Sequence, residues 1–260
     1  MVANDDRPSR QQRAGRYTID AVANALAIVG AIASREVLGL GEAAEVAGVS
    51  KSTAYRLLAT LEAAGLVERL PEGGYRAGIE AVRWASQLLG QLDVRRVAAP
   101  TLRQLRDETG ETVNLAILRE SSLVYVDILE SPAAFRMADV PGAIAPIHAT
   151  ALGKAVAVHL DPVRLAAILG PEPYEELTPN TARTWHDLSA RLAQARTSGY
   201  AVDLEEAAAG VVCVAAPILL RDQVAGAVSV SAPRARMSDE RIGEVGALVL
   251  DATFRIAERL

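Results

Sequence analysis

The clearest hydrophobic pattern in the chain covers residues 50–64 and predicts an amphipathic helix. Its apolar residues recur at i, i+3, i+4 and i+7, which places them on one buried stripe: Ala54, Leu57, Leu58 and Leu61. The opposite flank, near the start of the helix, carries Lys51, Ser52, Tyr55 and Arg56. Ser50 is a suitable N-cap, because its hydroxyl can accept a hydrogen bond from a free backbone N–H of the first turn.

The neighbouring segments add a turn and a small hairpin to this helix. A short helix over residues 42–47 comes first, with Gly41 at a cap position where a Ser or Thr would be stronger, and a tight turn follows at Gly48. Gly65 suits the C-terminal cap of the long helix. Residues 66–70 and 75–77 can then pair as two strands across the Pro- and Gly-containing turn 71–74.

Residues 18–33 carry another helical stripe, which we expect to pack behind the two helices just described. Its members are Val22, Ala25, Leu26, Val29, Ile32 and Ala33. Helix, turn, helix and β-hairpin together describe a winged helix-turn-helix, whose second helix enters the major groove of DNA with its N-terminal residues. The residues predicted to contact DNA are Lys51, Ser52, Thr53, Tyr55 and Arg56, with Arg76 from the hairpin. A trihelical fold without a nucleic-acid role is the alternative.

The remainder of the chain predicts a linker helix followed by an α+β domain. Residues 79–92 form an amphipathic helix in which Trp84 and Leu88 belong either to a dimer seam or to ordinary packing on the next domain. A helix over 94–107 contains Pro100, which should kink or restart it. Strands are expected at 112–118, 123–129, 200–204, 211–219 and 224–231, with helices from Thr150, over 161–169 and 188–198, and from Ser238. This mixed order favours an antiparallel sheet flanked by helices.

Composition and charge bound the functional classes. A length of 260 residues suggests about two domains. The net charge of −5 argues at first against a nucleic-acid partner, but residues 1–78 hold nine basic and nine acidic residues, which leaves 18 basic and 23 acidic residues for the remainder. A local basic patch rather than the total charge attracts phosphates. The charge is therefore compatible with DNA binding without indicating it.

The termini and the single cysteine favour a cytoplasmic protein. Cys213 cannot form an intrachain disulfide, and no apolar run approaches the roughly 20 residues that span a bilayer. The polar N-terminus lacks the apolar core of a signal peptide. Residues 1–17 are expected to be a disordered arm, although its arginines could also touch DNA phosphates: Arg7, Arg10, Arg13 and Arg16.

Several motifs in the second half recur in one family of proteins. They are residues 110–115 (GETVNL), 124–128 (VYVDI), 148–155 (HATALGKA), 199–206 (GYAVDLEE), Gly210, 213–217 (CVAAP) and 228–231 (VSVS). With the winged helix-turn-helix ahead of them, the chain resembles the IclR family of bacterial transcriptional regulators from about Thr18 to Leu260. The resemblance implies an α+β protein with a disordered arm (1–17), a winged helix-turn-helix (18–78), a linker helix (79–93) and a GAF/PAS-like effector-binding domain (94–260). It also implies dimers or tetramers whose DNA affinity is changed by a small, often acidic or aromatic, metabolite.

The same motifs contain a candidate ligand site. The free N–H groups of Ala151, Leu152 and Gly153 at the helix that Thr150 opens could dock a carboxylate, and Lys154 would add charge nearby. The alternative is that this helix start is an ordinary capped helix and binds no ligand. By its motifs, the resemblance carries the effector pocket onto Ala151, Leu152, Asp203, Cys213, Ser229 and Ser231, and the loop 135–142 with Met137 should help to choose the ligand.

Residue chemistry gives these positions a use, and each also has an ordinary structural explanation. Ser229 and Ser231 alternate with valines, so both point to one face of their strand. Asp203 could accept a hydrogen bond from a ligand hydroxyl, and Cys213 offers a small, weakly polar wall. Cys213 could equally be a buried core thiol, and Asp203 a turn carboxylate.

Two other functional classes are alternatives to a regulator. Cys213, His148 and Asp203 could form a nucleophile, a base and an orienting acid, but a thiol inside an apolar run would have a raised pKa and stay inert. A DNA-binding or oligomerisation module without a ligand is the other class. No cofactor and no metal site are expected, since no pair of residues has ligand spacing such as CxxC. We therefore expect a cytoplasmic, homo-oligomeric regulator that binds double-stranded DNA and a small effector, and does not associate with a membrane.

Overall fold

The structure is a computed structural model that describes residues 18–90, 92–133, 140–221 and 223–260. The chain divides into two compact units, Met1–Leu89 and Gly90–Leu260, which are considered separately. The predicted N-terminal arm and Met137 lie outside the described residues. No helix in the described part of the chain combines the length and the apolar character that crossing a membrane requires.

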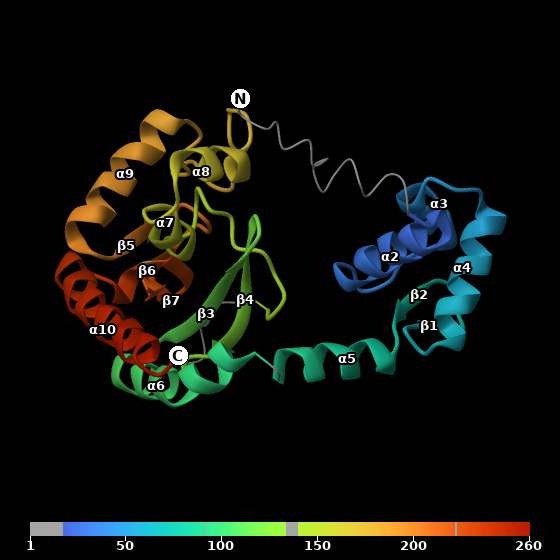
Figure 1. Cartoon of the computed structure of the whole chain (residues 1–260), viewed down its shortest axis with the longest axis horizontal. Coiled ribbons are helices and arrows are strands. Elements are labelled where there is room, and N and C mark those ends of the chain that lie inside the picture. Colours follow the sequence, from blue (N-terminus) through green and yellow to red (C-terminus); the bar gives the residue numbers. More distant parts are fainter. Residues whose placement is uncertain (1–17, 91, 134–139, 222) are drawn as a thin grey trace, which may run out of the picture. The chain divides into compact units, whose positions relative to one another are not determined.

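The first unit is a winged helix-turn-helix (Figure 1). Its elements are α2 (Asp20–Ala33), α3 (Leu40–Ala47), α4 (Lys51–Ala63), β1 (Val67–Arg69), β2 (Tyr75–Ala77) and α5 (Ile79–Gly90). Gly48 and Gly65 have φ values of 63° and 71°, in the left-handed region that favours glycine, which confirms the predicted turn and the predicted end of α4. The strands β1 and β2 pair antiparallel with Glu68 opposite Arg76. The predicted fold of this unit is therefore confirmed.

Two details of the first unit differ from the sequence-based expectation. Helix α3 begins at Leu40 rather than residue 42, and its start is held by the Glu42 carboxylate, which accepts a hydrogen bond from the Gly39 amide at 2.7 Å. In α2, Val22 and Leu26 are exposed, whereas Ile28 and Ile32 lie in the core. The helix has apolar residues around more than one side, so periodicity alone did not show which side faces inward.

The second unit is built on a five-stranded antiparallel sheet with the order β4-β3-β7-β6-β5. Its strands are β3 (Thr112–Arg119), β4 (Ser122–Leu129), β5 (Ala201–Leu204), β6 (Val211–Leu220) and β7 (Gln223–Pro233). Its helices are α6 (Asp93–Thr109), α7 (Ala151–Ala157), α8 (Pro162–Leu169), α9 (Trp185–Ser198) and α10 (Asp239–Ala257), with a 3-10 turn at Arg234–Arg236. The predicted α+β class and all five predicted strands are confirmed.

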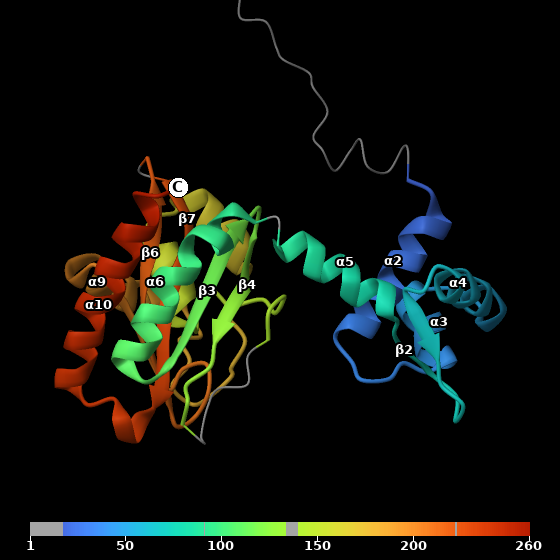
Figure 2. The ribbon, with the colours of Figure 1, turned by 90° about the horizontal axis from the view of Figure 1, so that it is seen from below.

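Helices cover both faces of this sheet (Figures 1 and 2). Helices α6 and α10 pack on one face, and α7 lies on the other, with α8 and α9 beyond it. On the α7 side, Ala151, Leu152 and Ala155 form one core with small residues of the sheet such as Ala215 and Ala227. Small side chains on both layers let α7 approach the sheet closely, so the start of α7 lies against the polar part of the same face.

Two helices of this unit differ in detail from the sequence-based expectation. Helix α6 does not restart at Pro100 but runs through it as one element. Helix α9 begins at Trp185, three residues before the predicted start, because Thr184 caps it by accepting a hydrogen bond from the Asp187 amide at 3.2 Å. The helices expected from Thr150 and over 161–169 are confirmed, and the side chains of Thr150 and Asp161 cap them by accepting hydrogen bonds from the amides of Gly153 and Arg164.

Candidate functional site

The first candidate surface is the N-terminal flank of α4. Ser50 caps the helix as predicted, accepting a hydrogen bond from the Thr53 amide at 3.3 Å. Its hydroxyl also lies 2.9 Å from that of Ser52 and 3.0 Å from that of Thr53. The two predicted hydroxyl contacts to DNA are therefore already ordered by the cap, with their side chains exposed.

The longer side chains of the same flank are open. Lys51, Tyr55 and Arg56 are exposed, and within the described part of the chain their side chains have no recorded hydrogen bond or ion pair. The buried stripe on the other side of α4 consists of Ala54, Leu58 and Leu61, with Leu57 partly buried. The flank is thus not packed against residues 18–89 of its own unit, and its positive charges are available to an anionic partner.

Arg76 of the hairpin is in a different situation. Its guanidinium pairs with the Glu68 carboxylate on the neighbouring strand at 3.0 Å, with both side chains about half exposed. An exposed ion pair of this kind contributes roughly 0–1 kcal/mol, so it can be exchanged for a phosphate contact at little cost. Its role in DNA binding stays a prediction.

The second candidate site is a cavity of about 170 Å³ between the start of α7 and the sheet of the second unit. Six of the predicted effector residues line it: Ala151, Leu152, Asp203, Cys213, Ser229 and Ser231. The rest of its lining is largely apolar and includes Tyr125, Ile144, Pro146 and Leu177, with Ala143, Thr150, Ala207, Ala208 and Val211. Residues as far apart in the sequence as Tyr125 and Ser231 thereby line one cavity.

Strand register explains why the polar residues of this cavity share one face. Asp203 of β5 is paired with Cys213 of β6, which is paired with Ser231 of β7. Directly paired residues point to the same side of a sheet, with their β-carbons about 5 Å apart. Ser229, two residues before Ser231 on β7, points to the same side of the sheet. The three neighbouring strands therefore present a continuous polar strip to the start of α7.

Gly153, also predicted to bind the effector, does not line the cavity. Its amide is already used, donating to the Thr150 hydroxyl at 2.9 Å. A β-carbon at this position would lie 2.5 Å from the Ile147 backbone, so the glycine is needed for close approach between two parts of the chain itself. The expectation that this glycine admits a ligand is accordingly replaced by a packing role.

Asn114 belongs to the site although the sequence did not single it out. From β3, its Nδ2 donates to the Ser229 hydroxyl oxygen at 3.1 Å and to that of Ser231 at 3.0 Å. Each serine oxygen accepts one of these bonds, which leaves its own O–H able to donate. Asn114 thus orients two hydroxyl donors on the face that lines the cavity. It lies within residues 110–115 (GETVNL), a motif that indicates the family but gives no chemical role to this residue.

Asp203 is almost fully buried, with an exposed fraction of 1%. Its Oδ1 accepts hydrogen bonds from the amides of Glu206 and Ala207 at 2.7 and 3.3 Å. Burial raises the pKa of Asp203 to about 6, and the nearby Lys154 ammonium only partly opposes this. Asp203 therefore both orders a turn and forms part of the cavity wall.

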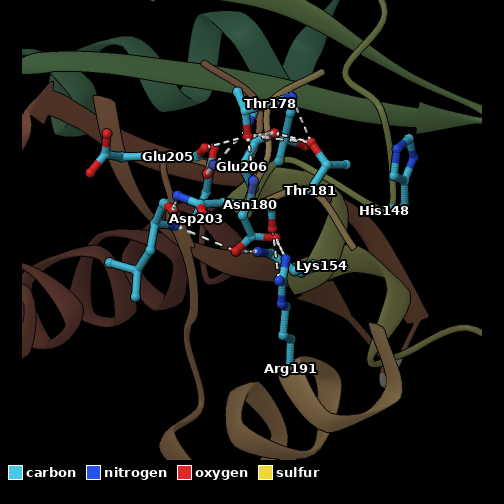
Figure 3. Close-up of polar contacts among 12 residues, drawn as sticks. His148, Lys154, Thr178, Asn180, Thr181, Arg191, Asp203, Glu205 and Glu206 are labelled. Atoms are coloured by element: carbon cyan, nitrogen blue, oxygen red, sulfur yellow. Dashed lines mark hydrogen bonds and ion pairs between the residues drawn. The ribbon is translucent and has the colours of Figure 1, made fainter. Parts of the chain in front are cut away.

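Lys154 is not placed where the sequence suggested. Instead of adding charge at the helix start, it is completely buried and forms an ion pair with Glu206 (Figure 3). Arg191 of α9 pairs with the other oxygen of the same carboxylate. Burial lowers the pKa of Lys154, and the Glu206 carboxylate opposes that shift. A lysine in an apolar helix requires such a partner, because an unpaired buried charge is very costly.

The loop that carries Glu206 is fixed from several sides. The hydroxyls of Thr178 and Thr181 each donate to its backbone carbonyls, at 2.6 Å to Glu205 and 2.6 Å to Glu206 (Figure 3). Glu205 has a φ of 59°, and its carboxylate accepts from the Gly210 amide at 2.7 Å. This loop also supplies Ala207 and Ala208 to the cavity. The pairing of Lys154 with Glu206 therefore ties α7 and the loop, two walls of the cavity, to each other.

The residues of the enzyme alternative do not assemble. The Nε2 atom of His148 lies 2.9 Å from the carbonyl oxygen of Glu175, and its ring packs on Tyr174 with centroids 5.6 Å apart. His148 does not line the cavity that Cys213 lines, and it stands apart from the Asp203 cluster in Figure 3. Among the described residues, His148 is therefore not placed to act as a base toward Cys213.

Comparison with protein families covers nearly the whole described chain. The family model described as "Bacterial transcriptional regulator IclR C-terminal" matches residues 86–258, and "IclR helix-turn-helix domain" matches residues 21–71. Among curated proteins, the chain is 35% identical over 241 residues to the HTH-type transcriptional regulator BhcR of Paracoccus denitrificans, covering 92% of this chain and 86% of that protein. It is 34% identical over 224 residues to the transcriptional repressor IclR of Escherichia coli, covering 84% and 81%.

Solved structures share the fold. A putative IclR transcriptional regulator from Silicibacter sp. TM1040 superposes with a TM-score of 0.78 at 28% identity, covering 92% of this chain and 95% of that one. An IclR homolog from Microbacterium hydrocarbonoxydans, solved in complex with 4-hydroxybenzoate, gives a TM-score of 0.78 at 22% identity, covering 92% and 98%. The second likeness concerns the fold alone.

Replacing Gly153 by alanine should destabilise the second unit. The new β-carbon would lie 2.5 Å from backbone atoms of Ile147, which cannot move as a side-chain end could. We expect a loss of about 1–3 kcal/mol in the free energy of unfolding, measured by chemical denaturation. Gly243→Ala in α10 is the matched control, because nothing lies within 4 Å of its added carbon and alanine favours a helix interior. Equal stability of both variants would refute the packing role.

The buried ion pair predicts an asymmetry between its two partners. Glu206→Gln leaves Lys154 buried without its carboxylate, so it should lower the free energy of unfolding by roughly 3–5 kcal/mol. Lys154→Met leaves Glu206 paired with Arg191 and should cost less. The double variant should be more stable than Glu206→Gln alone, again by chemical denaturation. If Lys154→Met were the more damaging single change, the charge argument would be wrong.

Proposed function

Because this chain belongs to the IclR family of bacterial transcriptional regulators, we propose that its two units divide one regulatory task between them. It is a ligand-responsive, DNA-binding regulator, with the DNA-binding surface on α4 and the effector cavity between α7 and the sheet. The observation that carries the proposal is the meeting of six predicted effector residues around one cavity in the second unit. We assign the protein no catalytic step, and we place it in the cytoplasm with the DNA it controls.

For DNA binding, the proposal rests on the exposed flank of α4. Lys51 and Arg56 supply positive charge, and Tyr55 lies between them with about half of its surface open. A recognition helix presents such N-terminal residues to base edges in the major groove, while the hairpin lies near the backbone. Arg56 is the best candidate for a base contact, because a guanidinium pairs bidentately with guanine. Ser52, Thr53 and Arg76 are proposed to contact phosphates.

For the effector, the proposal is a small organic carboxylate. The hydroxyls of Ser229 and Ser231 are available donors, and the cavity wall also includes the first residues of α7, Ala151 and Leu152. A volume of about 170 Å³ is close to that of a cavity that holds benzene, so the ligand has few heavy atoms unless the walls move. The homolog from Microbacterium hydrocarbonoxydans was solved with 4-hydroxybenzoate, a carboxylate of about this size class.

For assembly, the proposal is a homodimer or a dimer of dimers that pairs the DNA-binding units. Helix α5 has no buried residue and exposes Val82, Trp84 and Leu88. Helix α2 exposes Val22 and Leu26. Apolar faces of this kind favour contact with another copy of the chain. A ligand that binds one arrangement of the effector units better would shift the population of dimers, and α5 would transmit the change to the spacing of the DNA-binding units.

The DNA-binding assignment is tested by Arg56→Ala, with DNA from upstream of the protein's own gene as the probe. Loss of a bidentate base contact should weaken specific binding by about 1–3 kcal/mol while the oligomeric state and fold persist. Arg103→Ala, an exposed arginine of α6, is the matched control. Affinity of the wild type should also fall with salt, by about 0.9 log units per log unit of salt for each phosphate contact. Unchanged sequence preference in Arg56→Ala would remove this residue from base readout.

The effector assignment is tested by filling the cavity. Ala151→Trp places an indole in the space between α7 and the sheet, so it should abolish the thermal shift produced by carboxylates and leave DNA binding intact. Ser231→Val tests the same wall with a smaller change, in case the larger one disturbs folding. Ala166→Trp, at an exposed position of α8, is the control for adding an indole. A full ligand response in both cavity variants would place the effector elsewhere.

A further inference from the structure

We propose that an anionic effector enters the cavity together with one proton, which Asp203 holds. This inference rests on the proposed function, because it concerns how the effector cavity accepts a negative charge. The proton comes from solvent and attaches to the carboxylate oxygen Oδ2 of Asp203, and no covalent bond of the ligand changes. The affinity for carboxylates therefore depends on pH through Asp203, whereas the affinity for uncharged ligands does not.

The first argument is the balance of buried charge around the cavity. Lys154 of α7 and Arg191 of α9 supply two positive charges, and both pair with Glu206 (Figure 3). Asp203 is the second carboxylate of the cluster and interacts electrostatically with both Lys154 and Glu206. With Asp203 ionised, the four groups are neutral in sum. A carboxylate ligand would add one uncompensated negative charge to a buried site, which is costly unless a proton enters as well.

The second argument is what the cavity wall offers to an anion. Among the described lining residues, Asp203 is the one with a charge, and no Lys or Arg side chain is present. Of the other titratable residues that line the cavity, Cys213 of β6 lies directly opposite Asp203 in the strand register, and Tyr125 comes from β4 at the far edge of the sheet. The ammonium of Lys154 is directed to Glu206 and does not line the cavity. An ionised Asp203 would therefore repel a carboxylate placed beside it.

The third argument is the hydrogen bonding of Asp203 itself. Its Oδ1 is used by the amides of Glu206 and Ala207, which can stay in place whether the group is charged or neutral. Its Oδ2 accepts no hydrogen bond from the described residues, so this is the oxygen that can be protonated. A protonated Oδ2 becomes a donor, and an O–H to carboxylate bond is short and strong. One proton thus replaces repulsion by attraction.

The direction of the pH dependence follows from these charges. Burial already raises the pKa of Asp203 to about 6, so protonation is accessible near neutral pH, and an adjacent anion raises the pKa further. Above pH 6 Asp203 is mostly ionised in the ligand-free protein and must take up a proton when a carboxylate binds. The affinity for carboxylates therefore falls as the pH rises. Below pH 6 Asp203 is already protonated, and the dependence disappears.

The test is calorimetric titration of the full-length protein with acetate, lactate, pyruvate and 4-hydroxybenzoate, each beside its primary amide. Titrations at pH 7.5 in buffers of different ionisation enthalpy give the number of protons bound. We expect nearly one proton taken up with each bound carboxylate and none with an amide. Between pH 7 and 8.5 the affinity for carboxylates should fall about tenfold per pH unit. Carboxylate binding without proton uptake would overturn the inference and leave the effector cavity standing.

Variants assign the proton to its site. Asp203→Asn keeps an oxygen for the two amides and should abolish both proton uptake and the pH dependence. Glu205→Gln is the matched control: it removes the neighbouring carboxylate, which bonds to Gly210 outside the cavity, and should keep both. If Asp203→Asn does not fold, difference infrared spectroscopy of the wild type should show a protonated carboxyl band on adding pyruvate. Absence of that band, or retained uptake in Asp203→Asn, would contradict the assignment. Failure of every probe to bind at any pH would instead refute the proposed effector site.

Discussion

The second unit depends on the buried pairing of Lys154 with Glu206. The lysine stands in the middle of a seven-residue helix whose residues are all buried, and no arrangement of an apolar core could accept its charge alone. The carboxylate of Glu206, in a loop about fifty positions later, forms an ion pair with this lysine, and Arg191 of α9 pairs with the same carboxylate. The pair therefore brings α7, the loop after β5 and α9 into one arrangement. The cavity exists between elements that this pairing holds at a fixed distance.

A charge that is neutralised by an ion pair inside the protein is not available to bind a ligand. Lys154 looks like an anion-binding residue in the sequence, yet its ammonium is neutralised inside the protein. What faces the cavity is a milder set of groups: hydroxyl oxygens positioned by Asn114, a thiol, and a carboxyl group whose pKa is raised to about 6 by burial. Such a wall offers hydrogen-bonding groups rather than a fixed positive charge.

The first unit follows the opposite principle, in which local interactions determine almost everything. The hydroxyl of Ser50 starts α4, Gly48 and Gly65 supply the left-handed turns at either side, and the apolar stripe of α4 faces the core. Because the apolar stripe faces the core, the basic flank on the opposite side of α4 faces solvent. Among residues 18–89, no side chain forms an ion pair with Lys51 or Arg56, in contrast to Lys154, so their charge stays available for phosphates and bases.

The sequence by itself determined the winged helix-turn-helix, the five strands, the caps at Ser50, Thr150 and Asp161, and six residues of the cavity, because caps, periodicity and motifs are local signals. Tertiary structure decided the rest. It buried Lys154 and gave it Glu206, assigned Gly153 to packing on Ile147, placed Asn114 behind the serines, and turned Val22 and Leu26 of α2 outward. Each of these outcomes depends on which segments meet across the fold, and residues distant in sequence carry no local mark of their partners.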